Sequence, residues 1–292
     1  MYIMEIAGGS DLAACLQAFS TRYPVTVICR LTDYELERQY PNFRFVYLDG
    51  SVPEKRYYAL LESQADTLLI FEDTTRPIDR VAETLLEFSD WLDTAGMVGP
   101  LYLSGGLSSE EKALALLEYS FVCFSNTEHS KQEARARSGK KANRMPGNIL
   151  CYKKNRVYRV IPDQDTGIYE GRIDNHLEEV GEIIRFNDGF QFEYAGGDKD
   201  GTRLISRFLH GRLYAGQLKS SLSKGQLFLR ILRSPFLPLV FFVRVEKDLA
   251  RNHYGPVSIP VKAWIFIFSI AWSAGEMVGY IFGQGKSLEA WR

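Results

Sequence analysis

Apolar residues recur along the first half of the chain with two periods, one typical of buried strands and one typical of amphipathic helices. Short apolar runs between turn residues predict strands at Tyr2–Ala7, Val25–Cys29, Phe43–Leu48, Leu68–Phe71 and Met97–Leu103. Apolar residues three or four apart predict helices over Thr32–Gln39, after Pro53 with Tyr57, Leu60 and Leu61 on one face, and from Val81 to Trp91. Strands that alternate with helices at this pitch predict α/β architecture with a mostly parallel sheet flanked by helices.

The middle of the chain is basic, and its pattern predicts a helix, a loop, a strand and a second helix. Apolar residues from Ala113 to Phe124 predict the first helix. Residues 130–144 contain almost no apolar side chain, which favours a mobile loop. Residues 145–152 have the pattern of a turn that enters a strand, and the apolar stripe after Glu170 predicts a helix that ends at Gly181.

The last third of the chain combines basic residues with apolar stretches. Residues 204–222 carry an apolar stripe on a basic segment, as amphipathic helices at an anionic membrane do. Ser234–Val243 and Ala263–Gly275 contain no charged residue, but Glu276 interrupts the second stretch. A membrane span needs ~20 mostly apolar residues, so we expect in-plane or hairpin helices at a membrane. A tilted span over residues 259–283 and helices packed in a soluble core are the alternatives.

Charge is unevenly distributed although the net charge is only −1. Residues 1–120 carry 9 Lys and Arg against 19 Asp and Glu, whereas the remaining residues carry 26 against 17. A basic second half fits a phosphate-bearing partner or an anionic membrane surface, and uneven solvation is the alternative. We expect no nucleic-acid partner.

The cysteines, the N-terminus and the length indicate an intracellular chain with two parts. Four cysteines lie far apart, without the spacing of a zinc site or a disulfide framework, which favours a reducing compartment. The first residues lack the basic and apolar regions of a signal peptide. Basic residues beside apolar helices fit the cytoplasmic face of the cell membrane. We expect an α/β domain at residues 1–200 and a membrane-associating appendage at residues 201–292.

Two adjacent acids, Glu72 and Asp73, end the apolar run Leu68–Phe71. Open α/β sheets bind ligands at the carboxyl ends of their strands. Hard cations that hold a diphosphate require oxygen ligands such as these carboxylates. The pair therefore predicts a cation and phosphate site. The alternative is a solvated turn whose acids favour the N-terminus of the next helix.

A third candidate acid, Glu170, opens the helix that ends at Gly181, and its side chain is long enough to reach a pocket. The alternative is an acid placed in the first helical turn by the helix dipole. His176, on the polar side of this helix, is expected to be a surface residue. Further along, residues 202–233 hold seven Lys and Arg and no acid, which fits either anion binding or a solvated or lipid-facing surface.

Five motifs in this order resemble those of the family-two inverting glycosyltransferases with the GT-A fold. The closer likeness is to a membrane-associated subgroup whose metal-motif strand ends in Glu-Asp. The motifs are Phe71-Glu72-Asp73-Thr74-Thr75-Arg76-Pro77, Pro146-Gly147-Asn148 through Tyr152-Lys153-Lys154, Glu170 through Gly181, His210-Gly211-Arg212, and Ala271 through Glu276 with Gly279-Tyr280 and Gly283 behind it. The resemblance covers about residues 20–285.

The resemblance implies a transfer of a sugar from a nucleotide-sugar donor to a lipid-linked or growing glycan acceptor, with inversion. Glu170 would be the catalytic base, and Glu72 and Asp73 would hold a divalent cation, Mn²⁺ or Mg²⁺. Thr74 stands where the usual second Asp of the family binds the metal. A neutral hydroxyl is a poor substitute for a carboxylate on a hard cation.

The same resemblance assigns residues to the two substrates. Donor binding would involve Asp33, Asp49, Asp73, His210 and Arg212, and the acceptor side would involve Asn148 and Lys153. One alternative is a non-catalytic protein of the same fold that binds a nucleotide sugar or a partner, which Thr74 in the metal position favours. Another is an unrelated α/β nucleotide-binding protein.

Overall fold

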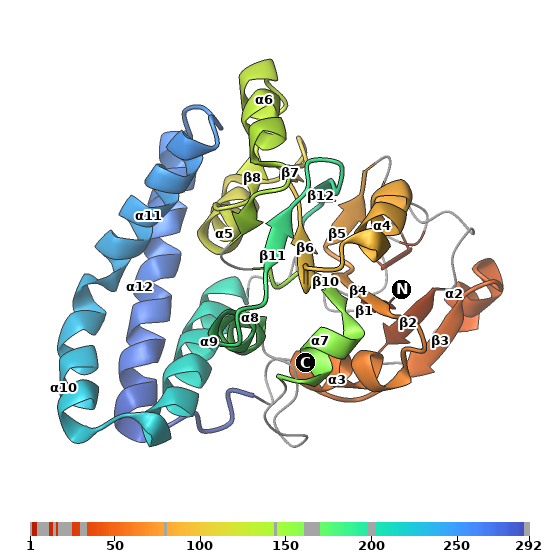
Figure 1. Ribbon diagram of the computed structural model, residues 1–292. Helices are drawn as coiled ribbons and strands as arrows, with labels where there is room; N and C mark the ends of the chain where they lie inside the picture. The colour runs from red at the N-terminus through yellow and green to blue at the C-terminus, as the bar shows by residue number, and fades with distance from the viewer. Residues whose placement is uncertain are drawn as a thin grey trace. The chain divides into compact units, whose positions relative to one another are not determined.

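The computed structural model describes residues 2–4, 12–13, 16, 25–29, 34–78, 81–142, 145–160, 170–197 and 202–288. The chain divides into two compact units (Figure 1). The first unit comprises Met1–Gly105 and Val122–Gly197, and the second comprises Gly106–Phe121 and Asp198–Arg292. The expected α/β fold class is confirmed in the first unit, which holds two sheets and the helices around them.

The larger sheet has eight strands in the order β3-β2-β1-β4-β10-β6-β11-β9 (Figure 1). Its parallel part is made of β3 (Arg44–Tyr47), β2 (Thr26–Cys29), β1 (Tyr2–Met4) and β4 (Thr67–Glu72). Its other strands are β10 (Ile149–Lys153), which is antiparallel to both neighbours, β6 (Gly96–Val98), β11 (Ile184–Phe186) and β9 (Lys141–Ala142). The β4 side chains from Leu68 to Phe71 are all buried, as expected for a strand covered on both faces.

The first unit has six helices with bounds in the described residues, of which α2, α3, α4 and α8 lie where the sequence predicts helices. They are α2 (Tyr34–Gln39), α3 (Val52–Glu62), α4 (Val81–Asp90), α6 (Glu128–Arg137), α7 (Lys154–Tyr158) and α8 (Glu170–Glu179). Ser51 and Glu54 form a capping box that starts α3, with Pro53 in its first turn. Gly181 has φ 78°, a conformation that glycine adopts without a Cβ penalty, and it ends α8 as predicted.

A smaller sheet in the order β5-β12-β7-β8 packs beside the larger one. Its strands are β5 (Thr75–Pro77), β12 (Phe192–Tyr194), β7 (Leu101–Leu103) and β8 (Cys123–Phe124). The two sheets share an aromatic core, because the rings of Phe71 in β4 and Phe192 in β12 lie 5.1 Å apart between centroids. Phe190 packs edge-on against Phe192 at 4.5 Å.

The single strand expected at Met97–Leu103 is wrong, because the chain changes sheets in the middle of it. β6 ends at Val98 in the larger sheet, and β7 starts at Leu101 in the smaller one. Gly99 permits this crossing, since a Cβ there would lie 1.8 Å from the carbonyl oxygen of Phe190. Pro100, which has no N–H to donate, separates the two strands.

The mobile loop expected at residues 130–144 is also wrong over most of its length. Helix α6 runs to Arg137, and β9 follows at Lys141–Ala142. The Thr127 side chain caps the helix by accepting from the Ser130 N–H, and Arg137 pairs with Glu133 one turn earlier at 2.9 Å. The Arg137 guanidinium also lies 5.3 Å from the Phe124 ring centroid, so tertiary contact compensates for the few apolar residues.

The second unit is helical. It contains α5 (Ser109–Tyr119), α9 (Arg203–Leu218), η2 (Lys219–Ser221), α10 (Lys224–Arg233), η3 (Ser234–Phe236), α11 (Leu237–Arg251) and α12 (Ile259–Phe282). Helix α5 is bound by its neighbours through ion pairs of Arg203 with Glu111 at 3.1 Å and of Arg207 with Glu118. The Ser120 hydroxyl donates to Asp248 of α11, and Asn252, which caps the end of α11, donates to the Ser120 carbonyl, each at 2.8 Å.

Glycines bring α9 and α12 into backbone contact. A Cβ on Gly211 would lie 2.3 Å from the Trp272 carbonyl oxygen, and one on Gly275 would lie 1.9 Å from the Phe208 carbonyl oxygen. A Cβ on Gly279 would lie 2.4 Å from the Arg212 carbonyl oxygen. Small residues at such positions let two helices approach more closely than side chains otherwise allow. Gly211, Gly275 and Gly279 of the last two sequence motifs therefore have a packing role within this unit.

Candidate functional site

The acidic turn Glu72-Asp73-Thr74 connects the two sheets of the first unit. Strand β4 ends at Glu72, and β5 begins at Thr75 in the smaller sheet. The Glu72 N–H donates to the Asn148 carbonyl at 3.0 Å, so the start of β10 lies directly beside the end of β4. The predicted carboxyl-end position of the two acids is therefore confirmed. Asn148, which belongs to a different sequence motif, lies next to Glu72.

Glu72 is paired with a residue that sequence reasoning missed. The Arg56 guanidinium of α3 lies 3.1 Å from Glu72 Oε1 and donates to the Gly147 carbonyl at 2.8 Å. Arg56 is 1% exposed, and Lys55 beside it is also fully buried. The prediction that Leu61 lies on the apolar face of α3 is wrong, because this side chain is 47% exposed.

A sequence signal for this face of α3 was present. Val52, Lys55, Arg56, Ala59 and Leu60 have helical spacing and are all buried. The two basic residues hide the stripe when only apolar side chains are considered. A basic pair at core spacing beside a strand that ends in two acids would have indicated the buried partner of Glu72.

Asp73 and Thr74 are both buried in the turn. Asp73 is 1% exposed, and the Thr74 carbonyl accepts from the Ala195 N–H at 2.9 Å. The Thr74 hydroxyl oxygen is buried and has no hydrogen-bond partner among the described residues. A buried hydroxyl without a partner loses hydration and gains nothing in return.

Asn148 contributes a second such atom. Its Nδ2 donates to the Thr75 Oγ1 at 2.8 Å, which orients the amide, and the residue is fully buried. Within the described part of the chain its Oδ1 has no partner. Two buried acceptor oxygens, on Thr74 and Asn148, therefore lie at this end of β4 without a donor from the residues that the structure describes.

Lys153 and Asn148, the two residues predicted for the acceptor side, lie at opposite ends of β10. Lys153 pairs with Thr67 at the start of β4, whereas Asn148 lies beside Glu72 at the end. The Lys153 amino group donates to the carbonyl oxygens of Ser89 and Trp91 and lies 5.4 Å from the Phe88 ring centroid. The two candidates are five residue steps apart along an extended strand, roughly 17 Å.

The remaining candidates of the first unit are placed only in part. Glu170 is the first residue of α8, and its side chain is not described. Asp33 lies outside the described residues. Asp49 is exposed in the loop after β3, at the carboxyl edge of the same sheet as Glu72.

His210 and Arg212 belong to α9 of the second unit. Desolvation, together with the nearby Arg207 guanidinium, lowers the pKa of His210 to about 3. The imidazole is therefore neutral at physiological pH, so His210 would bind a donor as a neutral group and not as a cation. The Arg212 Nε donates to the Gly283 carbonyl at 3.1 Å, and its Nη groups bond to no described residue.

The described residues do not fit a divalent cation site built by the protein alone. Across the described ranges, no group of three or more His, Cys, Asp or Glu side chains is placed to hold a metal. Arg56 neutralises Glu72, Asp73 is buried, and Thr74 offers only a hydroxyl. A hard cation prefers several charged or carbonyl oxygens that are not already paired with a cation.

Comparison with known proteins shows the fold. The sequence matches no protein-family model and no curated protein at a significant level. A mannosyltransferase, PcManGT from Pyrobaculum calidifontis, whose structure holds GDP-Man and Mn2+, is similar over 96% of this chain and 86% of that one, with a TM-score of 0.52 and 10% identity. GalNAc-T7, solved with UDP, GalNAc and Mn2+, aligns over 75% of this chain and only 51% of its own, with a TM-score of 0.48 and 11% identity. The α/β fold of this chain is accordingly of the GT-A type.

Proposed function

We propose that the chain transfers a sugar from a nucleotide-sugar donor to a lipid-linked or growing glycan acceptor, with inversion at the anomeric carbon. One observation carries the proposal. In a GT-A-type sheet, the central strand β4 ends in Glu72 and Asp73, beside two buried acceptor oxygens, on Thr74 and Asn148, that have no described donor. Hydroxyl groups of a bound sugar or nucleotide are donors of the kind that such oxygens lack.

In this proposal the chain's own residues position the substrates and move one proton. The donor lies over the strand ends near Asp33, Asp49 and Asp73. Glu170 accepts the proton of the acceptor hydroxyl as that oxygen attacks the anomeric carbon. The bond from this carbon to the diphosphate breaks, and its electron pair leaves with the nucleoside diphosphate. A positioned base typically contributes ~10²- to 10⁴-fold to such a rate.

Arg212 of the second unit is a candidate to bind the negative charge of a substrate. Arg212 is proposed to bind an anionic group of a substrate, because its Nη groups bond to no described residue. No step of the proposed reaction depends on a metal ion, because the described residues do not fit a metal site. Membership of the family-two inverting enzymes, in the subgroup with the Glu-Asp motif, belongs to this proposal and rests on the five sequence motifs.

A second candidate function is a non-catalytic GT-A-type protein that binds a nucleotide sugar or a partner. The pairing of Glu72 with Arg56 favours it, because a neutralised carboxylate is a weak ligand for a cation. Both candidate functions predict that the chain binds a nucleotide sugar, but only the first predicts that it transfers the sugar.

A screen of nucleotide sugars against the purified chain tests both candidates. We expect one donor, at a hundredfold excess over its Kd, to stabilise the protein by about 2.7 kcal/mol and raise Tm by roughly 5 °C. Running each donor with and without Mn²⁺ measures whether a cation takes part. Release of nucleoside diphosphate with the stabilising donor supports transfer. Binding without transfer or hydrolysis under any metal supports the second candidate, and stabilisation by free nucleotides alone contradicts both.

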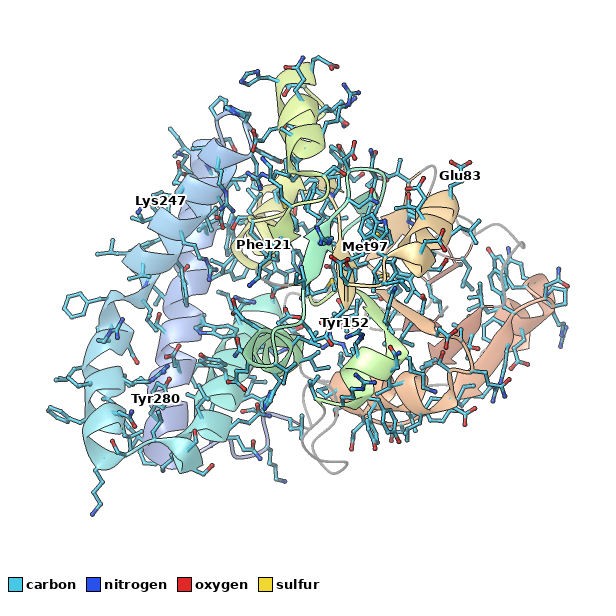
Figure 2. The ribbon with its side chains drawn as sticks, viewed as in Figure 1. Glu83, Met97, Phe121, Tyr152, Lys247 and Tyr280 are labelled. Carbon is cyan, nitrogen blue, oxygen red and sulfur yellow. The ribbon has the colours of Figure 1, made fainter. Side chains whose placement is uncertain are left out.

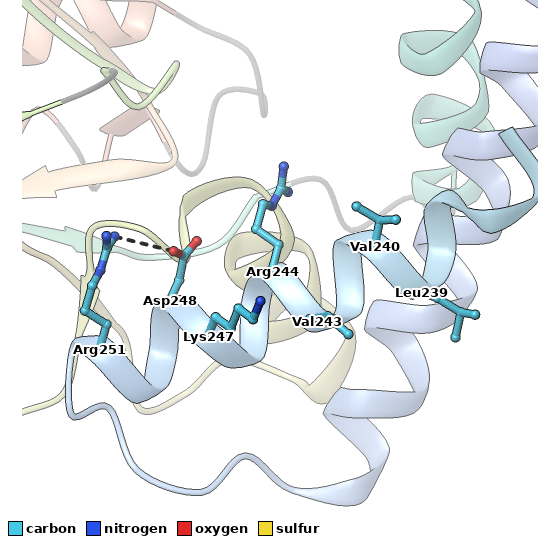
Figure 3. Close-up of a pocket in the computed structure, with 7 residues that line it drawn as sticks. All are labelled: Leu239, Val240, Val243, Arg244, Lys247, Asp248 and Arg251. Atoms are coloured by element: carbon cyan, nitrogen blue, oxygen red, sulfur yellow. Dashed lines mark hydrogen bonds and ion pairs between the residues drawn. The ribbon is translucent and has the colours of Figure 1, made fainter. Parts of the chain in front are cut away.

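The second unit carries an exposed apolar and basic surface, which we call the α10–α11 face. None of the α10 residues is buried, and Phe228 and Leu229 are 61% and 59% exposed. The face continues through Phe236 and Leu239. Along α11 it forms a groove of about 650 Å³ between apolar and charged side chains (Figure 3). The groove is lined by Leu239, Val240, Val243, Arg244, Lys247, Asp248 and Arg251.

We propose that this face binds the cytoplasmic surface of the cell membrane with its helices in the membrane plane. Two helical stretches, Lys224–Arg251 and Ile259–Phe282, are long and apolar enough by composition to cross a membrane. Within the first, however, the longest uncharged run is the ten residues Ser234–Val243. Ten helical residues extend about 15 Å, half of a ~30 Å hydrocarbon core. Basic residues that flank exposed apolar ones fit an anionic interface instead.

Replacing Phe228, Leu229 and Leu232 together by serine is expected to release the protein from anionic vesicles. Each side chain contributes ~1.5–3 kcal/mol when buried, so the partition coefficient should fall at least ~10²-fold. Flotation with vesicles that contain phosphatidylglycerol measures it. The control replaces Leu86 and Leu92 of the first unit, which are 62% and 81% exposed, and should bind like wild type. A triple variant that floats like this control would contradict the proposed face.

A further inference from the structure

Asp174 is a buried acid of α8 that the proposed reaction does not use. It is 5% exposed, and its two carboxylate oxygens bond different segments of the first unit. The Tyr152 hydroxyl donates to Oδ1 at 2.7 Å, and the Met145 N–H donates to Oδ2 at 2.7 Å. Tyr152, in β10, is only 1% exposed (Figure 2). These bonds are short and charge-assisted, and both are buried.

A carboxylate at this place in α8 requires an explanation, because it lies on the buried side of the helix. Ile173 and Leu177 on the same side of α8 are buried, and an apolar residue between them would pack without any loss of hydration. Apolar contacts leave a helix able to slide or rotate slightly, whereas two hydrogen bonds to one carboxylate have fixed directions. Asp174 therefore specifies where α8 lies rather than simply burying it.

The segments that Asp174 joins are those of the proposed site. Met145 lies three residues before Asn148, in the turn that enters β10. On the other side, Asp174 lies four residues after Glu170, one turn into α8. The same carboxylate thus ties the turn that carries Asn148 to the helix that begins at Glu170.

We infer that Asp174 is a positioning residue, which sets the place of the Glu170 backbone relative to the Asn148 turn by holding Tyr152 and Met145. The inference rests on the proposed function, in which Glu170 is the base. A base displaced by about 1 Å costs roughly 10²-fold in rate, whereas donor binding at the strand ends depends on other residues. Asp174 acts through Glu170 and touches no substrate.

The test compares D174N with E179Q in the full-length chain. Asparagine keeps the size but presents an N–H₂ group to one of the two donors. Glu179 is exposed on the same helix, so E179Q removes the same charge without a buried contact. With the donor found in the screen, we expect D174N to lower kcat roughly 10- to 100-fold with the donor KM within about twofold, and E179Q to change neither. Y152F, which removes one bond, should lie between them.

A double-variant cycle separates positioning from a general structural effect. If Asp174 acts only through Glu170, D174N on the E170Q background lowers the residual rate little further, less than about twofold. An equal fall on both backgrounds overturns the inference, and so does a D174N variant with wild-type kcat.

Hydrogen exchange supplies a readout that does not depend on activity. D174N should raise exchange in the first turns of α8 and in residues 145–149 together, and E179Q should raise it in neither. Faster exchange in only one of the two segments, or in neither, overturns the inference. If wild type turns over no donor, the proposed function fails and the role toward Glu170 fails with it. The paired exchange would then show the structural link alone.

Discussion

Replacing Glu170 by glutamine is expected to abolish sugar transfer and to leave nucleotide-sugar binding nearly intact. Glutamine has the same size and still accepts a hydrogen bond, but its amide does not take up the acceptor proton. The rate should fall ~10²- to 10⁴-fold, the range that a positioned general base contributes. Initial rates of nucleoside diphosphate release measure the fall, and the thermal shift with the same donor measures binding. The change removes one charge from the first turn of α8, which has only a small effect on helix stability.

The control for this variant is E179Q, at the other end of the same helix, which should transfer at the wild-type rate. If E170Q keeps more than a tenth of the wild-type kcat, the base lies elsewhere and the mechanism proposed above is wrong. Loss of both binding and transfer, with an unchanged melting temperature in the absence of donor, would instead place Glu170 in the donor site.

Replacing Arg56 by methionine is expected to destabilise the protein by about 3 kcal/mol. The guanidinium is buried between the Glu72 carboxylate and the Gly147 carbonyl, so its removal leaves Glu72 charged and poorly solvated. Breaking a buried ion pair costs ~3–5 kcal/mol. We expect the low end of this range because the Glu72 side chain is 13% exposed and not fully buried. Thermal and urea unfolding, followed by a probe in the first unit, measure the change.

Two further variants show whether charge burial is the cause. Arg44 pairs with Glu62 at 3.2 Å on the surface of the same unit, with 60% and 39% of the side chains exposed, so R44M should cost less than ~1 kcal/mol. Adding E72Q to R56M should recover part of the loss, because it removes the partly buried charge that Arg56 had paired with. An R56M variant as stable as R44M would show that the pair contributes nothing to the fold.

The alternation of β2, α2, β3, α3, β4 and α4 could be predicted from the sequence because period and turn chemistry are local. The run Leu68–Phe71 and its two terminal acids correspond to β4 and the turn that follows it. Gly181 ends α8 because only a residue without a Cβ adopts its positive φ without cost. The turn at Pro146-Gly147-Asn148 leads into β10 as predicted.

Errors arose where a local pattern has two tertiary solutions. Residues 130–137 have a polar composition typical of loops, yet side-chain pairs and contact with Phe124 make them helical. Residues 97–103 have a strand pattern throughout, and only the close approach of Phe190 to Gly99 reveals that the chain changes sheets there. Neither contact is encoded within a short window of sequence.

The sequence predicted which residues belong to the candidate site, but only the fold shows that they lie close together. Glu72, Asp73 and Asn148 could each be selected from motifs, but their proximity follows from the antiparallel pairing of β10 with β4. The same pairing moves Lys153 to the far end of the strand. The neutral state of His210 likewise depends on desolvation and on Arg207, which no motif contains.

The strands and helices from β2 to α4 that the sequence predicts, the acids at the end of β4 and the basic second half were determined locally, by hydrophobic period, by turn residues and by composition. The partners of those residues were decided by the tertiary structure. The Arg56–Glu72 pair joins positions 16 residues apart. The hydrogen bonds that Asp174 accepts from Tyr152 and Met145 join positions 22 and 29 residues apart. Buried charges and hydrogen bonds have energies set by what lies across the contact, and only the folded chain brings that partner within reach.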